Sequence, residues 1–465
     1  MKITDIDIKE CIALLAAKLS ILACKCIGRS GTSLSGKLAQ KIDRDILAKL
    51  SKGCRIIMVT GTNGKTTTTK MISEILRVNG VEHITNRSGA NLISGITSTF
   101  IRAVDMRGRC GIKTALLEVD EATVGKVTRW IKPDVMVVTN FFRDQLDRYG
   151  ELTAVVDKVR LGIERSPDAK LVLNADDSLC ASLGRDVGNK VLYYGVEEGA
   201  VEGIVEKGVQ EASYCLYCKT KYEYSYRVYG HFGGYRCPGC GYSRPDTQVG
   251  CEKVLSLNPD GSSIDYRMGG EMRELTIHAP GLYNIYNALA AAACGELLGF
   301  PAEKSAEAFG NFVSCFGRME TIDVGGKTLR VILTKNPAGF NQILNYLSLD
   351  ERKMNLSILI NDRTADGNDI SWLWDVEFEK MTQFAQRIEH VYVSGLRAED
   401  MALRLKYAGI DTAKTEIIKD YEKLVERGLE ATAPGGTFYI VSNYTAMMDI
   451  RRMLRKKYGL KEFWE

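Results

Sequence analysis

The sequence lacks a hydrophobic run long enough to cross a bilayer. The longest apolar stretch near the N-terminus runs from Cys11 to Ala17 and is bounded by Glu10 and Lys18. A membrane-spanning helix needs roughly 20 apolar residues, so this stretch is far too short. A secretory signal is also missing. We therefore expect a cytoplasmic protein without a transmembrane segment.

A large net charge is missing as well. The chain has 62 lysines and arginines and 58 aspartates and glutamates, which leaves a formal net charge of +4. So small an excess gives no support for nucleic-acid binding. Neither an internal repeat nor a low-complexity segment is visible. The 465 residues, of which 45% are hydrophobic, predict an ordinary globular protein with two or three domains.

Cysteine, by contrast, is plentiful. Thirteen cysteines in a long chain without a secretory signal predict reduced thiols and a metal site, not a disulfide framework. Four of them form the pairs Cys215-x-x-Cys218 and Cys237-x-x-Cys240, separated by 18 residues. This is the spacing of a zinc ribbon, and four thiolates close the zinc tetrahedron, so we expect a structural zinc. His231 lies between the pairs and is interpreted as a bystander.

The stretch that organises the chain runs from Ile56 to Met71. Its apolar start predicts a buried strand, Thr60 to Gly64 a glycine-rich turn, and the residues from Lys65 a helix. This order is the plan of a phosphate-binding loop, in which backbone N–H groups and the helix dipole attract an anion. We expect Lys65 to reach the outer phosphates and Thr66 to ligate Mg²⁺. A chance Gly-Lys-Thr turn between strand and helix is the simpler alternative.

Further strands of the same sheet follow along the chain. The segment Thr114 to Glu121 is predicted to be a strand that ends in carboxylates. Ligands of open α/β sheets bind beyond the carboxyl ends of the strands, so Glu118 is expected to ligate Mg²⁺; a solvated charge at the strand end is the alternative. A second buried strand runs from Asp134 to Asn140. Strands that alternate with helices predict an α/β protein with a mostly parallel sheet.

The first 50 residues are predicted to be helical. Ile12, Leu15, Leu19 and Leu22 form one apolar stripe. We expect this helix to pack on the nucleotide domain. The alternative is a helix that lies on a membrane surface, with its lysines available to anionic headgroups.

An alanine-rich helix begins near Asn284. Asn284 and Asn287 are three positions apart, so both can face one ligand. On this segment alone, two capping or surface asparagines would be the simpler interpretation. Beyond Phe316-Gly-Arg-Met-Glu320 the pattern of strands and helices predicts a second α/β domain.

Together these motifs resemble the Mur ligase superfamily from about Asp43 to the C-terminus. The loop Thr-Gly-Thr-Asn-Gly-Lys-Thr-Thr has two residues between its glycines, which is the form found in Mur ligases and folylpolyglutamate synthetases. A narrower resemblance is to the MurT family, because a four-cysteine ribbon is present, no nucleotide-sugar domain precedes the loop, and Asp366-Gly-x-Asp369-x-Ser-Trp matches a MurT motif.

The resemblance implies a fold and its division into domains. We expect an N-terminal helical segment at residues 1–42 and a Mur ligase-type central ATP-binding domain at 43–315. A four-cysteine zinc ribbon is inserted in that domain at 212–245. A C-terminal α/β domain follows at 316–465.

An activity and a partner are also implied. Ligase subunits of the MurT family work with GatD, a class I glutaminase that hydrolyses glutamine to ammonia. They use ATP and Mg²⁺ to activate the α-carboxyl of D-glutamate in the lipid II stem peptide as an acyl phosphate. The resemblance therefore implies an ATP-dependent ligase of peptidoglycan biosynthesis that forms D-isoglutamine at the cytoplasmic face of the cell membrane.

Roles for single residues follow from the resemblance. Lys65 and Glu118 are expected to serve phosphoryl transfer, Asn284 to approach the adenine, and Arg318 to contact phosphates from the second domain. Asp369 is expected to orient the histidine of the glutaminase across the subunit interface. The loop residues expected to hold the triphosphate are Gly61, Thr62, Asn63, Gly64, Lys65, Thr66 and Thr67.

Three positions depart from the amide-forming Mur ligases. Gln145 and Tyr283 stand where those enzymes have histidines, and Lys335 stands in the segment that carries their ribose-binding aspartate. A second metal ion and the usual ribose contacts are therefore not implied. Two alternatives remain: a stand-alone amino-acid ligase, which needs no glutaminase, and a non-catalytic nucleotide-binding scaffold that recruits a partner. The intact Gly-Lys-Thr and Glu118 oppose the scaffold.

Overall fold

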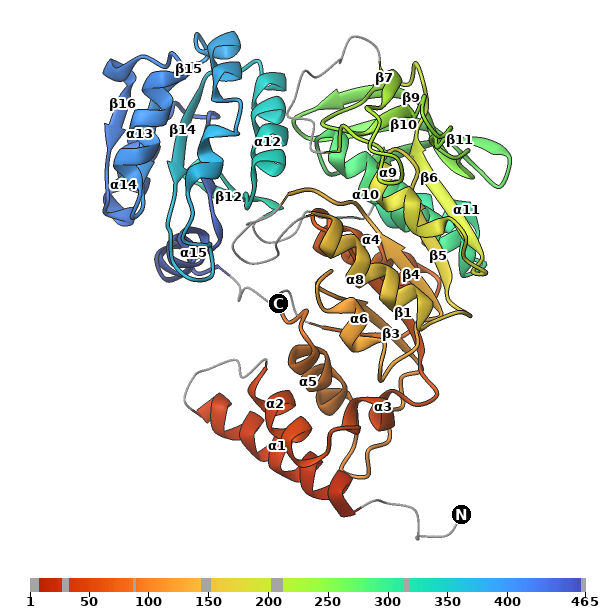
Figure 1. Ribbon diagram of the computed structural model, residues 1–465. Helices are drawn as coiled ribbons and strands as arrows, with labels where there is room; N and C mark the ends of the chain where they lie inside the picture. Colours follow the sequence, from red (N-terminus) through yellow and green to blue (C-terminus); the bar gives the residue numbers. More distant parts are fainter. Residues whose placement is uncertain are drawn as a thin grey trace.

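A computed structural model describes residues 8–26, 33–86, 89–143, 152–201, 212–310, 312 and 318–460. Three parts follow one another along the chain: a small group of N-terminal helices, a large central sheet with helices on both faces, and a second sheet that begins at residue 318 (Figure 1). None of the described helices is both long and apolar enough to span a membrane.

The central sheet has nine strands in the described part of the chain, in the order β11-β10-β9-β6-β5-β4-β1-β3-β2. Neighbouring strands in the part of this order from β9 to β2 pair in parallel. At the other side of the sheet, β9, β10 and β11 pair antiparallel and form one edge. The bounds are β1 Arg55–Thr60, β2 Ile84–Thr85, β3 Thr114–Glu118, β4 Val135–Val138, β5 Lys170–Asn174, β6 Val191–Val196, β9 Val249–Asn258, β10 Gly261–Met268 and β11 Glu271–Ile277.

Both faces of this sheet are buried, because alternate side chains of each strand point to opposite sides. In β1, Ile57 and Val59 join the core on one face, and Ile56 and Met58 join the core on the other. The first core lies under α4 Lys65–Val78, α10 Leu282–Leu297 and α11 Ala302–Gly310. The second lies under α5 Ile93–Ala103, α6 Val124–Val127, α8 Leu152–Glu164, α9 Ser178–Ala181 and η1 Ser182–Gly184.

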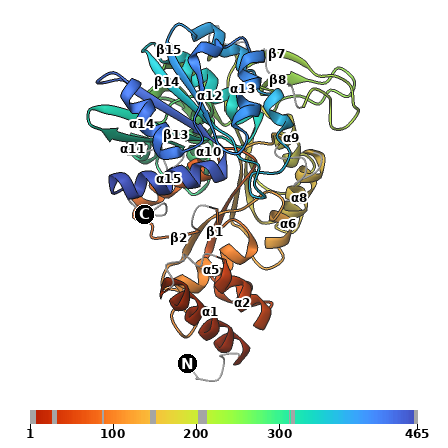
Figure 2. The same cartoon turned by 90° about the vertical axis from the view of Figure 1, so that its left-hand side faces the viewer.

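The N-terminal helices are α1 Ile8–Cys26, α2 Leu34–Ile42 and α3 Ile46–Ser51. They pack beneath α5, at the end of the molecule away from the C-terminal domain (Figures 1 and 2). The helix α1 packs on this unit through Ala13, Leu14 and Ala17, which are buried. The apolar stripe that contains Leu15 and Leu19 instead faces outward. The helix α1 therefore packs on the rest of the chain as expected, but it does so through a different face from the apolar stripe.

The ribbon is a short antiparallel hairpin between β6 and β9. Its strands are β7 Glu223–Arg227 and β8 Gly233–Arg236. The hairpin packs at the carboxyl ends of β5 and β6, where the Tyr226 hydroxyl donates to the Val196 carbonyl at 2.7 Å and the Gly233 N–H donates to the Asp176 carbonyl at 3.2 Å.

The C-terminal part is a second α/β unit, as the sequence predicts. Its six strands have the order β12-β13-β17-β14-β15-β16, and only β12 pairs antiparallel within the described residues. The bounds are β12 Arg318–Val324, β13 Lys327–Leu333, β14 Met354–Leu359, β15 Ile388–Ser394, β16 Thr415–Ile417 and β17 Thr437–Ser442; the helices are α12 Pro337–Leu349, η2 Ser371–Trp374, η3 Phe378–Phe384, α13 Ala398–Tyr407, η4 Thr412–Lys414, α14 Tyr421–Ala431 and α15 Tyr444–Tyr458.

Candidate active site

The loop between β1 and α4 is shaped by two glycines that no other residue can replace. Gly61 has a φ of 125°, and a Cβ there would lie 2.3 Å from the Thr139 hydroxyl. Gly64 has a φ of 83°, and a Cβ there would lie 2.1 Å from Oδ1 of Asn287. Both positions are left-handed and crowded, so the backbone can turn tightly into the N-terminus of α4. The strand, the glycine turn and the helix therefore form as the sequence predicts.

The residues after β4 hold this loop from one side. The Thr62 N–H donates to the Asn140 carbonyl at 2.8 Å, and the Asn63 N–H donates to Oδ1 of Asn140 at 2.9 Å. The Thr139 hydroxyl and the Asn140 side-chain amide both donate to the Asn63 carbonyl, at 2.7 and 3.1 Å. These bonds fix the loop backbone, and a fixed backbone lowers the entropy that ligand binding must overcome.

Lys65 is buried and forms an ion pair with Glu121. Its Nζ lies 2.9 Å from Oε2 of Glu121, and the two side chains are 11% and 3% exposed. The ammonium also donates to the carbonyls of Gly61 and Thr62. Burial alone lowers the pKa of Lys65, but attraction to the carboxylates of Glu121 and Asp120 outweighs it and raises that pKa. The lysine is therefore held in its charged form at the loop.

Glu118 lies at the carboxyl end of β3, beside the loop. Val59 of β1 is in register with Glu118, and both strands run parallel, so their carboxyl ends meet. The side-chain amide of Asn86 bonds both the N–H and the carbonyl of Glu118, at 2.8 Å each, which fixes the strand end. The Glu118 side chain is buried. A buried carboxylate next to a phosphate-binding loop is a donor that suits Mg²⁺.

On the opposite side of the loop, Asn287 is the asparagine of α10 that touches it. Oδ1 of Asn287 accepts from the Thr68 hydroxyl at 3.2 Å, and its amide donates to Oδ1 of Asn284 at 3.0 Å. Asn284 is buried one turn earlier, and its own amide donates to the Pro280 carbonyl at 2.7 Å. Asn287 lines the cavity described next, whereas Asn284 is linked to that cavity through Asn287.

A cavity lies between the loop and the C-terminal domain. The central domain lines it with Asn63, Gly64, Thr67 and Asn287. The C-terminal domain lines it with seven mostly apolar residues. These are Met319, Ile332, Leu333, Ala338, Gly339, Gln342 and Ile343, from β12, β13 and α12. The two domains therefore enclose a site at the start of the phosphate-binding helix, which is where a nucleotide binds in such folds.

Asn336 links the two domains directly. It caps α12 by accepting from the Gly339 N–H at 2.8 Å, and its amide donates to Oδ1 of Asn63 at 3.2 Å. A second link joins Arg330 of β13 to Asp260 of the β9–β10 turn at 3.1 Å. The C-terminal domain thus contacts Asn63, a residue of the loop between β1 and α4.

The remaining wall of the cavity is aromatic and includes the tip of the ribbon. Phe142, Tyr229 and Tyr283 line the cavity, and Tyr229 belongs to the turn between β7 and β8. The rings of Phe142 and Tyr229 are stacked with centroids 6.1 Å apart, and Phe232 packs beneath both, 5.1 Å from Phe142 and 4.7 Å from Tyr229. A flat apolar wall of this kind suits the base of a nucleotide.

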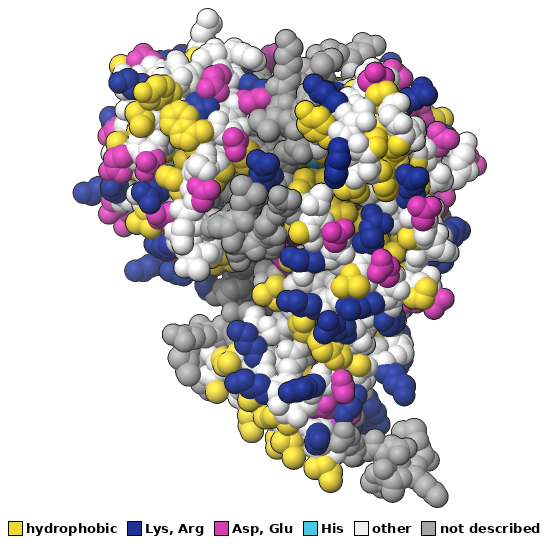
Figure 3. Space-filling view, in the orientation of Figure 1, with side chains coloured by type: hydrophobic (Ala, Val, Ile, Leu, Met, Phe, Trp, Pro, Cys, Tyr) yellow, Lys and Arg dark blue, Asp and Glu magenta, His cyan; other side chains and the backbone are white. Residues whose placement is uncertain are grey.

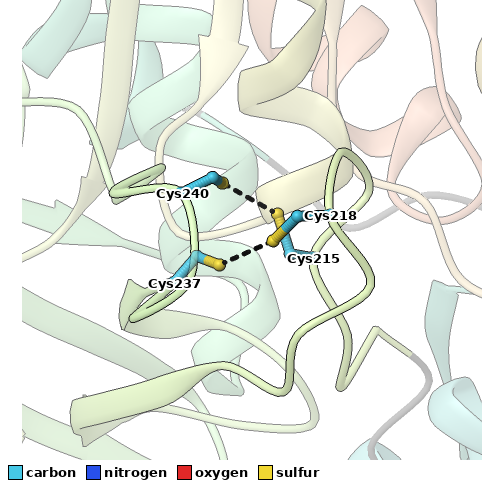
Figure 4. Close-up of side chains that lie close together, drawn as sticks. All are labelled: Cys215, Cys218, Cys237 and Cys240. Carbon is cyan, nitrogen blue, oxygen red and sulfur yellow. Dashed lines mark hydrogen bonds between the residues drawn. The ribbon is translucent and has the colours of Figure 1, made fainter.

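The four ribbon cysteines converge on one point (Figure 4). The Sγ atoms of Cys215 and Cys240 are 3.5 Å apart, those of Cys218 and Cys237 are 3.3 Å apart, and all four lie within 4.8 Å of one another. Sulfurs about 2.3 Å from a tetrahedral zinc are about 3.8 Å apart, so the donor set fits zinc. His231 is fully buried and is not part of this group.

The ribbon is firmly attached to the central domain. Arg244, just after the second cysteine pair, forms ion pairs with Asp176 at 2.6 Å and with Glu197 at 3.1 Å. Asp176 is fully buried and also accepts from the Tyr286 hydroxyl of α10 at 2.6 Å. The buried His231 lies 3.3 Å from Asp177, which caps α9. The ribbon therefore has a fixed orientation, and Tyr229 has a fixed place in the cavity wall.

Asp369 does not line this cavity and lies on an exposed loop after β14. Its two carboxylate oxygens accept from the Ser371 N–H at 2.8 Å and the Ser371 hydroxyl at 2.9 Å. These bonds hold the pKa of the Asp369 carboxyl below its ordinary value. The neighbouring motif residue Asp366 is buried and bonds Thr445. Asp369 is thus an ionised, pre-oriented carboxylate that faces outward.

Some predicted residues lie outside the described part of the chain. Arg318 begins β12, but its side chain is not described, and Gln145 lies outside the described residues. Of the other two departures from the Mur ligases, Tyr283 lines the cavity wall and Lys335 directly precedes the cap of α12.

Sequence reasoning missed three residues of the site: Glu121, Tyr229 and Asn336. Glu121 ends the carboxylate motif after β3, and only its burial beside Lys65 sets it apart from the others. Asn336 precedes Pro337, a pair that marks a helix start and so offered a signal. Tyr229 gave none, because a tyrosine in a tyrosine-rich hairpin has no local feature that places it in a distant cavity.

The fold and the site together are those of a Mur-type ligase. Residues 59–235 match the Mur ligase middle domain, and residues 333–447 match the family described as MurT ligase C-terminal. A pseudomurein peptide ligase type C from Methanothermus fervidus has a similar fold, with a TM-score of 0.64 at 22% identity over 90% of this chain and 84% of that chain. MurF from Acinetobacter baumannii gives 0.66 at 14% identity over 91% and 80%.

Relatives with higher sequence identity indicate which kind of Mur-type ligase this chain resembles. The MurT subunit of the glutamine-hydrolysing lipid II isoglutaminyl synthase of Streptococcus pneumoniae is 35% identical over 97% of this chain and 98% of its own length. Its counterpart in Staphylococcus aureus is 34% identical over 97% and 99%. The chain therefore belongs to the MurT family of Mur ligases, and the predicted fold class and family are confirmed.

Proposed function

We propose that this chain is the ATP-dependent ligase subunit of a lipid II isoglutaminyl synthase. It amidates the α-carboxyl of D-glutamate in the lipid II stem peptide, with ammonia from a GatD-type glutaminase. The observation that carries the proposal is an intact phosphate-binding loop, with Lys65 charged and buried, in a chain that matches MurT subunits over almost its whole length.

The chemistry explains why ATP is needed. A carboxylate does not react with ammonia, because oxide would have to leave. When a carboxylate oxygen attacks the γ-phosphorus of ATP, the bond to the bridging oxygen breaks, ADP leaves, and an acyl phosphate forms. The ammonia nitrogen then attacks the acyl carbon, the carbon–oxygen bond breaks, and phosphate leaves as ammonia gives up a proton. The products are the amide, ADP and phosphate.

The loop residues supply the electrostatic part of the first step. The N–H groups at the start of α4 attract the phosphates, and the Lys65 ammonium is placed to neutralise charge that moves onto the bridging oxygen. Mg²⁺ at this site would supply positive charge that lowers the repulsion between the phosphates and the attacking carboxylate. Glu118 and the Thr66 hydroxyl are the residues that would hold it.

In the structure described here Lys65 faces Glu121, so nucleotide binding exchanges one anionic partner for another. Attraction to the Glu121 carboxylate favours the charged form of Lys65 and fixes the position of its ammonium. The lysine is thus oriented before the phosphates arrive. We assign Glu121 as a positioning residue and not as a group that touches the reacting atoms.

The base of ATP is assigned to the cavity between the domains. Phe142 and Tyr229 offer flat apolar surfaces there, and Asn287 offers an amide that also touches Gly64. The link from Asn336 to Asn63 supports coupling between closure of the C-terminal domain and nucleotide binding. In this proposal, Asn284 supports the base site through Asn287.

A structural zinc ion fits the four ribbon cysteines. Two of the four thiols, Cys215 and Cys237, are buried, and no further donor belongs to the group within the described residues. A closed site of four thiolates leaves no position for substrate. We therefore assign the zinc to the stability of the ribbon, and through the ribbon to the position of Tyr229.

Asp369 is proposed to act on the partner and not on ATP. A glutaminase of this class has a cysteine nucleophile and a histidine, and a carboxylate that orients the histidine stabilises its imidazolium. Asp369 is ionised, exposed and fixed by Ser371, which supports this role. The glutaminase would then be slow until the ligase subunit docks.

The test is co-expression of the chain with a GatD-type glutaminase, followed by purification of the complex. Incubation with ATP, Mg²⁺, glutamine and lipid II should lower the mass of the stem peptide by about 1 Da, as a hydroxyl is replaced by an amino group. Addition of an amino acid in place of ammonia would establish a stand-alone ligase instead.

A further inference from the structure

The outer face of α1 carries a continuous apolar stripe that no described residue of this chain covers. Its members are spaced by four and three residues, so they share one face of the helix. Their exposed fractions are 75% for Ile8, 51% for Ile12, 50% for Leu15, 56% for Leu19 and 58% for Leu22. Monomeric proteins seldom expose large aliphatic side chains in such a row, so the stripe marks an interaction surface.

The opposite face of the same helix is already used. Ala13, Leu14 and Ala17 are buried against the core that includes α2, α3 and α5. The stripe is therefore a second apolar face of α1. The packing of α1 on the rest of the chain uses the other face and not the stripe. In Figure 3 it forms a band of hydrophobic side chains along the lower left edge of the molecule, with lysines and arginines on the surface beside it.

The charge around the stripe is strongly positive. The first 53 residues contain ten lysines and arginines and five aspartates and glutamates, a net charge of +5, whereas the whole chain carries +4. The remaining 412 residues thus carry a net charge of −1. Exposed Lys37, Lys41 and Arg44 belong to this positive end. An apolar stripe bordered by basic residues is complementary to an anionic bilayer surface.

A second copy of the chain is a poorer occupant. The stripe has the spacing of a coiled-coil seam, but it covers only about two heptads, and stable coiled coils need roughly three or four. Two copies would also bring together two N-terminal segments that each carry an excess of positive charge, which is unfavourable.

We propose that α1 lies in the surface plane of an anionic bilayer, with Ile8, Ile12, Leu15, Leu19 and Leu22 inserted among the acyl chains. The surface lies at the end of the molecule away from the C-terminal domain, so membrane binding leaves that domain clear (Figures 1 and 2). The biological reason rests on the proposed function, because a lipid-linked substrate stays in the bilayer. The binding itself depends only on the stripe and the charge.

The test is sedimentation of the full chain with vesicles of phosphatidylcholine alone and of phosphatidylcholine with 30% phosphatidylglycerol. We expect binding to the anionic vesicles that weakens at high salt, and at least tenfold weaker binding for Leu15→Ser/Leu19→Ser. The matched control is Leu255→Ser/Met272→Ser, which removes two exposed apolar side chains from the antiparallel edge of the central sheet. The control should bind like the wild type.

Three outcomes overturn the proposal. The first is no binding to anionic vesicles, and the second is equal binding by the wild type and the Leu15/Leu19 variant. The third is a wild-type dimer in sedimentation velocity that the same variant converts to a monomer, which would assign the stripe to a second copy. Amidation of a short-chain lipid II analogue in detergent should be unchanged in the variant. Failure of that reaction in the wild type would count against the proposed function and not against the membrane surface.

Discussion

The chain presents two carboxylate sites that differ in almost every physical respect. Glu121 is buried at the loop between β1 and α4, where it pairs with a buried lysine, and the backbone of that loop is bonded to Asn140. Asp369 is exposed on a loop, and its carboxylate accepts hydrogen bonds from Ser371, two residues away. The first site is complete within the chain, whereas the second is a single prepared group. This difference fits the proposal that the first site serves the ATP-dependent chemistry and that Asp369 completes a site on the partner.

The comparison has an energetic side. Removing one member of a buried ion pair leaves an uncompensated charge, which costs about 3–5 kcal/mol unless the remaining group changes its protonation. An exposed carboxylate that caps its own turn contributes little to the fold. Substitutions at the first site should therefore disturb ATP-dependent chemistry whatever the ammonia source. Substitutions at the second should disturb only what the partner does.

The largest effect is expected for Lys65→Ala. It should lower amidation at least about a thousandfold with either glutamine or ammonium, since the charge at the phosphates is lost. Burial raises the pKa of Glu121, so the carboxyl left behind can take up a proton and the fold should persist. Steady-state kinetics of the purified complex measure this effect. Lys70→Ala, an exposed lysine on the same helix, is the control. Activity within about tenfold of the wild type would remove the loop from the mechanism.

Asp369→Asn should come next. It keeps the shape of the side chain and removes its charge, so glutamine-driven amidation should fall about a hundredfold or more. Glutamate release by the complex, measured separately, should fall in parallel. Asp375→Asn, a change of another aspartate shortly after the same motif, should leave both rates near wild type.

A smaller effect is expected for Glu121→Gln. In the wild type Glu121 raises the pKa of Lys65. Lys65 is therefore fully charged below the ordinary pKa of lysine, and it loses its charge only as the pH rises through the higher pKa that it has in the folded protein. Removing the carboxylate lowers that folded pKa. We expect amidation at pH 7 to fall about tenfold, and the alkaline limb of the kcat/KM profile to move to lower pH. An unchanged alkaline limb would show that Glu121 does not set the charge of Lys65.

The smallest effect on chemistry is expected in the ribbon. Cys237→Ser should lower zinc content and thermal stability, and should raise the KM for ATP a few-fold because the wall that contains Tyr229 loosens. The kcat should change less than the KM. Metal analysis and thermal unfolding of the variant check this, and a wild-type protein that is freshly purified without zinc would reject the site.

The parts of the site that the sequence predicts are those in which local residues dictate local geometry. The phosphate-binding loop needs glycines at Gly61 and Gly64, and the ribbon needs two cysteine pairs at fixed spacing, so both are visible in short stretches. The mostly parallel sheet and the second α/β unit follow in the same way from alternation of strands and helices. These features depend on a few neighbours in the chain.

The missed features depend on contacts between distant segments. Tyr229 reaches the cavity only because Arg244 and Asp176 fix the ribbon against the central sheet. Asn336 meets Asn63 across the boundary between the two domains, 273 residues away along the chain. The stripe on α1 shows a related limit, since periodicity finds an apolar face but does not say what covers it. Here a second, smaller face of the helix is the one that packs inside.

The most direct test of the central claim is one assay with two ammonia sources. The wild-type complex, Lys65→Ala and Asp369→Asn are each given lipid II, ATP and either glutamine or ammonium, and amide formation is measured. We predict that Lys65→Ala loses both reactions, whereas Asp369→Asn loses the glutamine reaction and keeps the ammonium reaction near the wild-type rate. Equal loss of both reactions in Asp369→Asn, or normal use of glutamine by it, would contradict the separation of the two sites.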